Sequence, residues 1–437
     1  MKKYPNFVKD TLISIIKKMN ESPEDFVKNP GKDFTRNRKL TFEYVINLLL
    51  SMGGNNLYKE LLEYFKYDAD TASSSAFVQQ RAKILPSALE FLFKNFTSSY
   101  ENHKTFKGYR LLAVDGSKLN ITRNPNDPDT YVKCTTDARG YNILNLNALY
   151  DLPNKLYVDA CILPIRKNNE SGALINMLEK SAISDDVIVI ADRGYESYNV
   201  FAHIQEKGWK YVIRVKDKNS KSIVSTLNLP SSEEFDEKIY LNITRKQTKE
   251  IKSNPKLYKI LSKNSKFDYF ELQNCDIYTI SFRVVRFKIS EGNYETIITN
   301  IDETEFSSET IKEIYHMRWG IETSFRELKY AIGLVNLHSK KVEFITQEIF
   351  AKLTMYNFCE MITMNVVISH KQRKHKYQVN FTVAIHICKH FFRCLEDEIP
   401  PDVELLIQLN ILPVRKGRQD KRNLKTKSST SFIYRVA

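Results

Sequence analysis

The chain has 437 residues, of which 42% are hydrophobic and 27% charged, and its 66 Lys and Arg residues exceed its 52 Asp and Glu residues. The hydrophobic share excludes an intrinsically disordered chain, and the length is sufficient for two or three folded domains. The formal net charge of +14 favours a polyanion such as nucleic acid as the partner.

The cysteines and the N-terminal segment indicate the compartment. The six cysteines are widely spaced and form no C-x-x-C pair, which is typical of a reducing interior rather than of a disulfide framework. The apolar run 11–16 is followed at once by Lys17 and Lys18, so it is a poor signal peptide and too short a membrane span. We therefore expect a cytoplasmic protein that makes no membrane contact.

Residues 1–105 are predicted to be helical. Apolar residues recur near the helical period in 42–50, 58–65 and 77–96, the last interrupted near Pro86. Short helices joined by tight turns suit a helix-turn-helix-like DNA-binding region, and a plain helical bundle fits the same pattern equally well. In the DNA-binding interpretation, the phosphate contacts would be Arg36, Arg38, Lys39, Arg81 and Lys83.

Residues 106–340 change to an α/β pattern. Their order is three strands, a helix, a strand, a helix and a strand, which is the order of a ribonuclease-H-like core. That topology would bring the ends of the first and fourth strands side by side. The predicted strands are 111–118, 144–150, 156–163, 187–191 and 211–215, and the predicted helices are 171–181 and 198–207.

Two aspartates lie where buried strands end. Asp115 follows the apolar run 111–114, Asp192 follows the run 187–191, and a glycine comes soon after each. Carboxylate oxygens at adjacent strand ends are suitable ligands for a hard divalent cation. Together with a glutamate from a helix, they would form the type of metal site that acts on phosphodiesters.

Residues from about 217 to 295 are expected to form a β-rich insertion into this core. They are rich in Lys, Ser and Asn, with strand-like runs at 238–245 and 277–287. The segment 295–300 then returns to the core as a strand. From the residues alone, the insertion could clamp DNA or be an inert elaboration.

A helix is predicted across Tyr315, Arg318, Glu322 and Lys329. At about 100° per residue, these four side chains fall within about 60° of one another on one face, beside an apolar stripe. An ordinary amphipathic helix could show the same arrangement. Trp319 in this segment, like Trp209 upstream, is predicted to be a packing residue.

Residues 341–437 are predicted to form a helical, basic C-terminal region. The helices are expected at 346–366 and 380–395. Positive charge is concentrated at 371–376 and 415–427.

These motifs resemble the DDE transposases of bacterial insertion sequences that carry the Y-x2-R-x3-E-x6-K signature, the IS-four family. Tyr315, Arg318, Glu322 and Lys329 match the signature without a gap, and Asp115 with Gly116 and Ser117 matches the region of the first aspartate. The second aspartate corresponds to Asp192, followed by Arg193, Gly194 and Tyr195. The resemblance extends from about residue 34 to about residue 357.

The resemblance implies an Mg²⁺-dependent DNA transposase, bacterial and associated with the nucleoid. Asp115, Asp192 and Glu322 would be the catalytic residues and would hold two Mg²⁺ ions, for which Mn²⁺ would substitute. DNA contacts are assigned to Tyr315, Arg318 and Lys329, with Arg326 as a secondary candidate.

The expected reaction is cut-and-paste transposition at the terminal inverted repeats, through a hairpin, with the 3′ ends then joined to target DNA. The partners are double-stranded DNA, as transposon ends and target, and a second copy of the chain on paired ends. Two other functions stay open: a metal-dependent nuclease without strand transfer, and a domesticated DNA-binding protein that no longer cuts.

Overall fold

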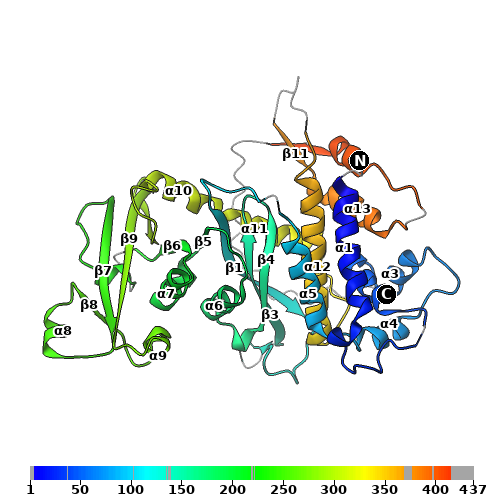
Figure 1. Ribbon diagram of the computed structural model, residues 1–437, viewed down its shortest axis with the longest axis horizontal. Helices are drawn as coiled ribbons and strands as arrows, with labels where there is room; N and C mark the ends of the chain where they lie inside the picture. Colours follow the sequence, from blue (N-terminus) through cyan, green and yellow to red (C-terminus); the bar gives the residue numbers. More distant parts are fainter. Residues whose placement is uncertain are drawn as a thin grey trace.

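A computed structural model describes residues 4–36, 38–101, 103–133, 135, 139–217, 220, 222–368, 376–395 and 398–414 (Figure 1). The fold is mixed α/β: one large sheet carries helices on its faces, and further helices gather at one end. The basic run 415–427, and all of the run 371–376 except Lys376, lie outside the described residues. Within the described part of the chain, no helix is both long enough and apolar enough to cross a membrane.

The sheet runs in the order β2-β3-β1-β5-β6-β10-β9-β7-β8, with β4 paired to β3. The predicted order of strands and helices in the first half of the sheet is confirmed, with the short β2 as an addition. The bounds of the strands are β1 Arg110–Ile121, β2 Tyr131–Val132, β3 Tyr141–Asp151, β4 Leu156–Pro164, β5 Val187–Ala191, β6 Lys210–Val215, β7 Phe235–Thr244, β8 Tyr258–Ile260, β9 Ile277–Ser290 and β10 Asn293–Thr299.

The centre of the sheet is built from parallel strands. β1 pairs with β5 in parallel, ending at the pair Ala113 and Ile190, and β5 pairs with β6 in parallel. Every residue of β5 is buried, as expected for a strand covered on both faces. β1 and β5 therefore lie side by side, as predicted, but they do not end together, because β5 ends at Ala191 whereas β1 continues along β3 to Ile121.

The β-rich segment continues the same sheet. β10 pairs antiparallel with β6 and with β9, and β9 pairs antiparallel with β7. The strands predicted in this segment, and the predicted return to the core through residues 295–300, are confirmed. Two short helices, α8 (Lys249–Ser253) and α9 (Tyr269–Leu272), lie near its far edge (Figure 1).

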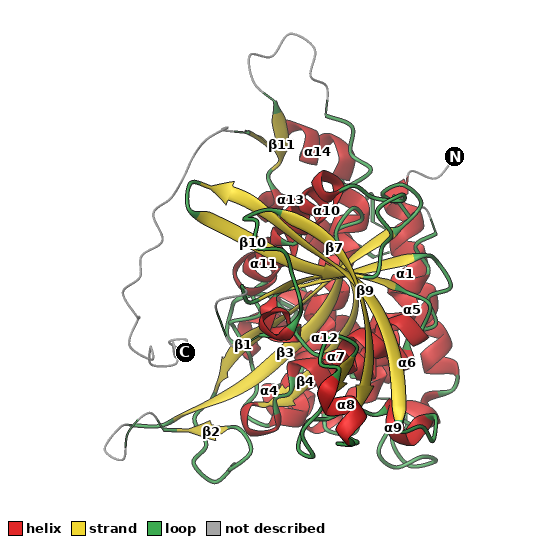
Figure 2. Ribbon diagram, turned by 90° about the vertical axis from the view of Figure 1, so that its left-hand side faces the viewer, coloured by secondary structure: helices red, strands yellow, loops and turns green. Residues whose placement is uncertain are grey.

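Helices cover both faces of the central strands (Figure 2). α6 (Glu170–Lys180) and α7 (Tyr198–Glu206) pack on one face with Leu112 and Val114. The other face is covered by α10 (Ser308–Met317) and α11 (Trp319–Arg326). Successive residues of β1 point to opposite faces of the sheet. Their side chains therefore enter the hydrophobic cores on opposite sides of the sheet.

The helices at the two ends of the chain share one hydrophobic core. Nearly all of α12 (Val342–Thr363) is buried, and helices from both ends of the chain surround it. The five N-terminal helices therefore pack as a bundle against α12, whereas a separate DNA-binding region stays a prediction. The surrounding helices are α1 Tyr4–Glu21, α2 Phe42–Ser51, α3 Leu57–Tyr64, α4 Ser74–Arg81, α5 Pro86–Ser98, α13 Phe381–Arg393 and α14 Val403–Leu409.

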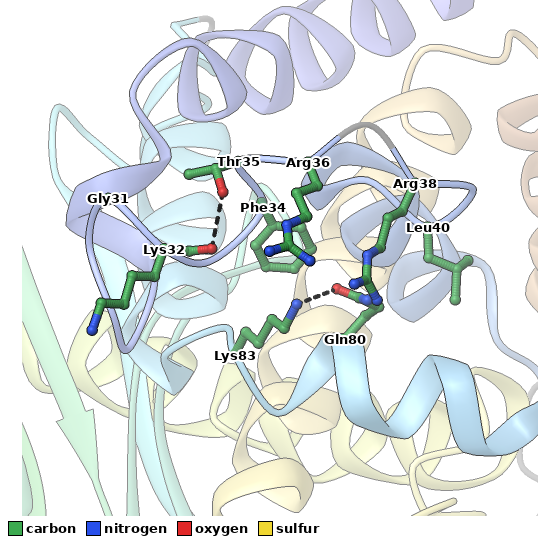
Figure 3. Close-up of a pocket in the computed structure, with 9 residues that line it drawn as sticks. All are labelled: Gly31, Lys32, Phe34, Thr35, Arg36, Arg38, Leu40, Gln80 and Lys83. Atoms are coloured by element: carbon green, nitrogen blue, oxygen red, sulfur yellow. Dashed lines mark hydrogen bonds between the residues drawn. The ribbon is translucent and has the colours of Figure 1, made fainter.

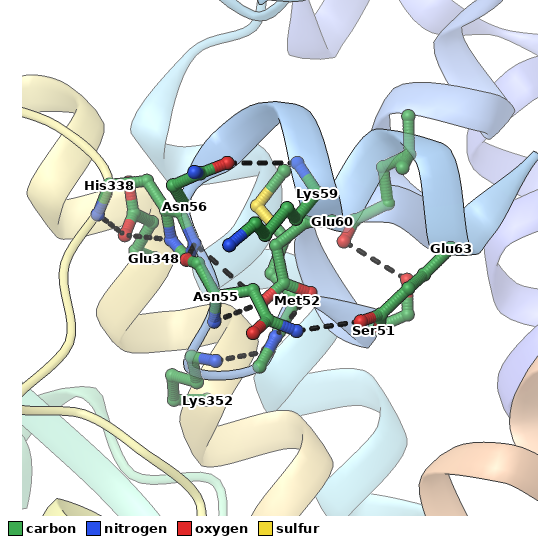
Figure 4. Close-up of polar contacts among 12 residues, drawn as sticks. Ser51, Met52, Asn55, Asn56, Lys59, Glu60, Glu63, His338, Glu348 and Lys352 are labelled. Atoms are coloured by element: carbon green, nitrogen blue, oxygen red, sulfur yellow. Dashed lines mark hydrogen bonds and ion pairs between the residues drawn. The ribbon is translucent and has the colours of Figure 1, made fainter. Parts of the chain in front are cut away.

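Buried polar contacts join the N-terminal helices to α12 (Figure 4). Glu60 accepts hydrogen bonds from the backbone N–H groups of Gly53 and Asn55, and Lys352 donates to the carbonyl of Met52. His338 donates its backbone N–H to Glu348 over 2.7 Å. These contacts hold the segment around His338, which follows the Glu322 helix, against α12 and the N-terminal helices.

Arg81 belongs to this buried network, so its assignment as a phosphate contact is wrong. Its side chain is 1% exposed, pairs with Glu348 at 3.0 Å and donates to Gln347 and to the carbonyl of Phe344. An arginine at helical spacing looks the same in sequence whether it faces solvent or a buried carboxylate. Only the packing of α4 against α12 distinguishes the two.

Candidate functional site

The two predicted aspartates lie on adjacent strands, but only Asp192 is at a strand end, because Asp115 lies inside β1 opposite Ala148 of β3. Asp115 follows the last residue pair between β1 and β5 by two positions, and Asp192 directly follows β5. The Asp192 carboxylate accepts a hydrogen bond of 2.8 Å from the N–H of Gly194 in the turn after the strand. Both carboxylates are half-buried. The pattern of an apolar run followed by Asp therefore located the end of β5 correctly, whereas the prediction that a strand ends at Asp115 is wrong, because β1 continues to Ile121.

One continuous helix was predicted for the segment that carries Glu322, and this prediction is wrong. α10 ends at Met317, α11 begins at Trp319, and residues Glu327–Ala331 form a π-helical turn. The regular helical period is therefore lost after Glu322, in the π-helical turn, whereas Arg318 keeps helical backbone angles and contacts Glu322 one turn later. Lys329 lies in the wider turn, so the shared helical face predicted for the four signature residues does not extend to it.

Arg318 connects two of the predicted catalytic carboxylates. Its Nη2 donates to Glu322 Oε1 over 2.7 Å, and its Nη1 lies 3.8 Å from Asp115 Oδ2. The side chain is only 7% exposed, so these contacts are shielded from solvent. A guanidinium with its planar set of donors can hold two carboxylates in a fixed relation, which one lysine ammonium does less well.

Asp115 is surrounded by like charge. Burial raises its pKa to about 6, and the charges of Asp192 and Glu322 act in the same direction. The N–H of Gly116 and the Arg318 guanidinium oppose this rise. The three carboxylates predicted to act together are thus close enough to influence one another electrostatically.

The donor set fits a hard divalent cation. It consists of carboxylate oxygens whose mutual repulsion a cation would relieve, and oxygen is the ligand that Mg²⁺ prefers. As the side chains lie, however, Arg318 stands between Asp115 and Glu322. No group of three or more His, Cys, Asp or Glu side chains among the described residues is spaced to hold one ion.

Tyr315 is buried beside Arg318. Its ring is 4% exposed, and the guanidinium groups of Arg214 and Arg318 lie about 6 Å from its centre. In this conformation the ring has no open face on which an unpaired base could stack. Its hydroxyl is buried without a hydrogen-bond partner among the described residues, which leaves it free to bind a phosphate oxygen.

The two remaining predicted DNA contacts differ in exposure. Lys329 is half-buried, and its Nζ donates to the carbonyl of Lys118 on β1 over 2.9 Å, while burial lowers its pKa. Arg326 is exposed on α11, one turn after Glu322. Lys329 therefore ties the π-helical turn to the strand that carries Asp115, and Arg326 points to solvent.

Residues 106–358, more than half of the chain, match the family described as the transposase DDE domain. The chain belongs to this family. The matched residues include every strand of the sheet and the segment that carries Glu322. The prediction of an insertion-sequence DDE transposase is confirmed, whereas the individual role of each signature residue stays a prediction.

Known relatives and one solved structure are similar to this transposase. Over 72 residues it is 35% identical to the putative transposase InsL for insertion sequence element IS186A of Escherichia coli (strain K12), and equally to the transposase for IS421 of Escherichia coli. These matches cover 16% of the chain, and they span about a fifth of each relative's length. A piggyBac transposase synaptic complex with hairpin DNA aligns with a TM-score of 0.46 at 12% identity, over 97% of this chain and 88% of that one.

Trp319 of the transposase is exposed, so its assignment as a packing residue is wrong. It is 56% exposed at the start of α11, and the Arg318 guanidinium lies 5.5 Å from its ring centre. The packing prediction is confirmed for Trp209, which is 4% exposed. A large exposed aromatic residue beside the carboxylates is a candidate contact for DNA bases that the sequence interpretation missed.

A basic pocket of about 450 Å³ lies among the N-terminal helices of the transposase (Figure 3). The side chains of Arg36, Arg38 and Lys83 extend toward one another across it. Lys83 donates to Gln80 over 2.9 Å, whereas both arginines are exposed. Of the five predicted phosphate contacts, Arg36 and Arg38 thus remain available, and Lys39 is paired with Asp70 at 2.8 Å.

Proposed function

We propose that this transposase cuts DNA at the terminal inverted repeats of its own insertion sequence and joins the 3′ ends to target DNA. Membership of the DDE family supports the reaction class. The observation that carries the proposal is the contact of Arg318 with both Asp115 and Glu322, because it unites the central strand β1 and a helix distant in sequence in one charged site.

We also propose that the central strands form a ribonuclease-H-like core. Its support is the strand order of the sheet, with β1 parallel to β5 and β5 parallel to β6. In such a core the two aspartates lie at one edge, and the glutamate comes from a helix on the sheet's face. The β-rich segment between Asp192 and Glu322 extends the sheet away from that edge.

Asp115, Asp192 and Glu322 would hold two Mg²⁺ ions, with Mn²⁺ as a substitute. When bound, such ions stabilise charge on the scissile phosphate and lower the pKa of the attacking water. The carboxylates supply the negative charge that attracts the ions, and Arg318 offsets that charge in the conformation described here.

The neighbouring side chains would bind the DNA end. Arg318 offers a planar pair of donors to a phosphate, and Lys329 offers a point charge near β1. Arg326 extends the positive surface outward from α11. The Tyr315 hydroxyl, buried and unpartnered among the described residues, would donate to a phosphate oxygen once DNA is bound.

The proposed sequence of steps is cut-and-paste. A first hydrolysis frees a 3′ hydroxyl, that hydroxyl attacks the opposite strand to form a hairpin, water reopens the hairpin, and the 3′ end then attacks target DNA. Two ends must be held together for paired insertion, so we propose a homodimer on paired ends.

The test is cleavage of a plasmid that carries the element's terminal repeats, with Asp192→Ala as the variant. Loss of the Asp192 carboxylate should abolish cleavage while end binding, measured by gel shift, persists. Asp186→Ala is the matched control, because Asp186 is exposed at the opposite end of β5. Normal cleavage by Asp192→Ala would refute the proposal.

A strand-transfer assay on the same plasmid separates the remaining functions. Joined products support a transposase, whereas cut products that never join to target DNA indicate a nuclease. End binding without cutting by the natural chain indicates a DNA-binding protein that has lost catalysis.

A further inference from the structure

A fourth carboxylate, that of Glu170, lies beside both aspartate turns. Glu170 is the first residue of α6, on the opposite face of the sheet from α11. A Cβ placed on Gly116, next to Asp115, would lie 3.0 Å from Glu170 Oε1. A Cβ placed on Gly194 would lie 3.3 Å from Glu170 Oε2 and 3.0 Å from Asp192 Oδ1. The Glu170 carboxylate therefore spans the space between the two turns.

Asn147 on β3 directs a second oxygen into the same space. Its side chain is fully buried, and its Oδ1 would lie 3.1 Å from the same Gly116 Cβ position. The amide nitrogen faces the carbonyl of Cys161 and Asn168 Oδ1, each at 3.4 Å, which fixes the orientation of the amide. Its Oδ1 is left without a hydrogen-bond partner in the described part of the chain.

Glu170 itself has no hydrogen-bond or ion-pair partner among the described residues, although it is half-buried. Two acceptor groups, Glu170 and Asn147, thus converge on the Cβ position of Gly116. Burying unsatisfied acceptors is costly, and a bound cation or its water shell would satisfy both. Glycine at position 116 keeps the space between the two oxygens open, because a side chain there would meet both of them.

Tyr195 closes the inner side of the same space. It is fully buried, and its hydroxyl has no partner within the described ranges. Burial raises its pKa well above the usual value, and the charges of Glu170, Asp115 and Asp192 add to the rise. Tyr195 directly follows Gly194, so its unpartnered hydroxyl is a further buried polar group next to the turn that faces Glu170.

We propose that Glu170 and Asn147, together with Asp192, form a further divalent-cation site on the α6 side of the sheet. Carboxylate and amide oxygens select Mg²⁺ or Mn²⁺ over softer metals. Tyr195 contacts the water shell of the ion. The role of this cation in DNA cleavage rests on the proposed function, whereas its binding does not.

The test measures Mn²⁺ binding to the full chain without DNA, from the loss of the electron paramagnetic resonance signal of free Mn²⁺. Glu170→Gln removes the charge at nearly constant shape and should weaken binding at one site by about 10-fold or more. Glu313→Gln is the control, because Glu313 is exposed on α10. Superimposable curves for Glu170→Gln and Glu313→Gln would overturn the proposal.

Two further variants locate the site. Gly116→Ala places a methyl group between Glu170 and Asn147 without a change in charge, and should cause the same loss of Mn²⁺ affinity. In Glu322→Gln, the Glu170-dependent binding should persist, because Glu322 lies on the opposite face. The proposal of a separate site is contradicted if Gly116→Ala binds Mn²⁺ with full affinity. It is also contradicted if Glu322→Gln no longer shows the Mn²⁺ binding that depends on Glu170. Thermal unfolding without cation checks that each variant is folded.

Cleavage assays separate this inference from the proposed function. Suppose that the natural chain cuts DNA, and that Glu170→Gln equals the natural chain in both Mn²⁺ binding and cutting. The inference then fails and the proposed function stands. If the natural chain binds Mn²⁺ through Glu170 yet never cuts the terminal repeats, the function fails and the inference stands. If both hold, Glu170→Gln should require a higher Mg²⁺ concentration for half-maximal cleavage.

Discussion

At the scale of single residues, Arg318 organises the candidate site. It is nearly buried and contacts Asp115 and Glu322, which would otherwise repel each other across a poorly solvated space. A residue in this position can hold the carboxylates in place before DNA arrives and then turn its donors to a phosphate. The same side chain would thus act in assembling the site and in binding the DNA end.

Replacement of Arg318 by alanine tests this double role. We expect Arg318→Ala to impair hairpin formation and opening roughly 10- to 100-fold more than the first nick, which is the effect of losing one or two charge-assisted hydrogen bonds. The measurement is the rate of each step on a labelled terminal fragment. Arg318→Lys, which keeps charge without the planar fork, is the comparison variant. An equal loss at every step would count against the role.

The two tryptophans provide a second contrast at this scale. Trp319→Ala removes an exposed side chain, so we expect the free energy of unfolding to change by less than about 0.5 kcal/mol while affinity for the DNA end falls. Trp209→Ala removes a buried ring and should cost about 3–5 kcal/mol of stability. Denaturant unfolding and gel shift measure the two effects. Unchanged DNA affinity in folded Trp319→Ala would remove Trp319 from the contact surface.

At the scale of elements, α12 supports the turn that follows the Glu322 helix. Tyr356 on α12 donates to Glu327 in the π-helical turn over 3.1 Å and also contacts Glu360. The Tyr356 ring packs against Tyr157 on β4, with ring centres 4.9 Å apart. One buried helix therefore links the sheet to the end of the segment that carries Glu322 through polar as well as apolar contacts.

The burial of Glu360 makes stability depend on pH. Burial raises its pKa to about 7, and the charge of Glu327 adds to the effect, so the folded chain holds a proton that the unfolded chain releases. The contribution of Glu360 to stability should be greatest below about pH 4.5 and decline by about 3 kcal/mol as the pH rises to about 7.

Glu360→Gln is the variant that checks this pH dependence. The amide cannot ionise, so the variant should gain stability over the natural chain at pH 8 and differ little from it at pH 4.5. Urea unfolding at both pH values measures the difference. A stability gap between the two chains that is the same at pH 4.5 and pH 8 would show that Glu360 does not titrate on folding.

At the scale of the whole molecule, the helices from the two ends of the chain form one packed body against the sheet. The hydrophobic core that surrounds α12 includes N-terminal helices, strands β1, β3 and β4, and the helices after residue 340. The Arg81–Glu348 pair lies inside this body and joins α4 to α12. The basic residues of the N-terminal region are therefore of two kinds. Arg81 is buried and stabilises the fold, whereas others, such as Arg36, are exposed.

Arg81→Ala and Arg36→Ala should separate stability from DNA binding. Removal of Arg81 leaves the Glu348 carboxylate buried without that partner and should cost about 3–5 kcal/mol of unfolding free energy. Removal of exposed Arg36 should leave stability within about 0.5 kcal/mol and reduce the dependence of log affinity for DNA on log salt by roughly 1. If Arg81→Ala instead reduced the salt dependence of DNA binding and Arg36→Ala reduced stability, Arg81 would be the phosphate contact.

Features that depend on local pattern could be predicted from the order of the amino acids. Runs of apolar, β-branched residues predicted the central strands, and the aspartate after each run predicted Asp115 and Asp192 on neighbouring strands. The spacing of Tyr315, Arg318, Glu322 and Lys329 indicated the family. These features follow from the chain's own periodicity, because a strand or helix must bury its apolar face wherever it packs.

Only the tertiary structure decided which side chains face one another. The burial of Arg81, the exposure of Trp319 and the π-helical turn at Lys329 each depend on an element far away in sequence. Glu170 and Asn147 are ordinary residues in their own segments, and they become a candidate site only when α6 and β3 meet beside Gly116. Local periodicity carries no information on such long-range contacts, so the pockets between elements could not be predicted from it.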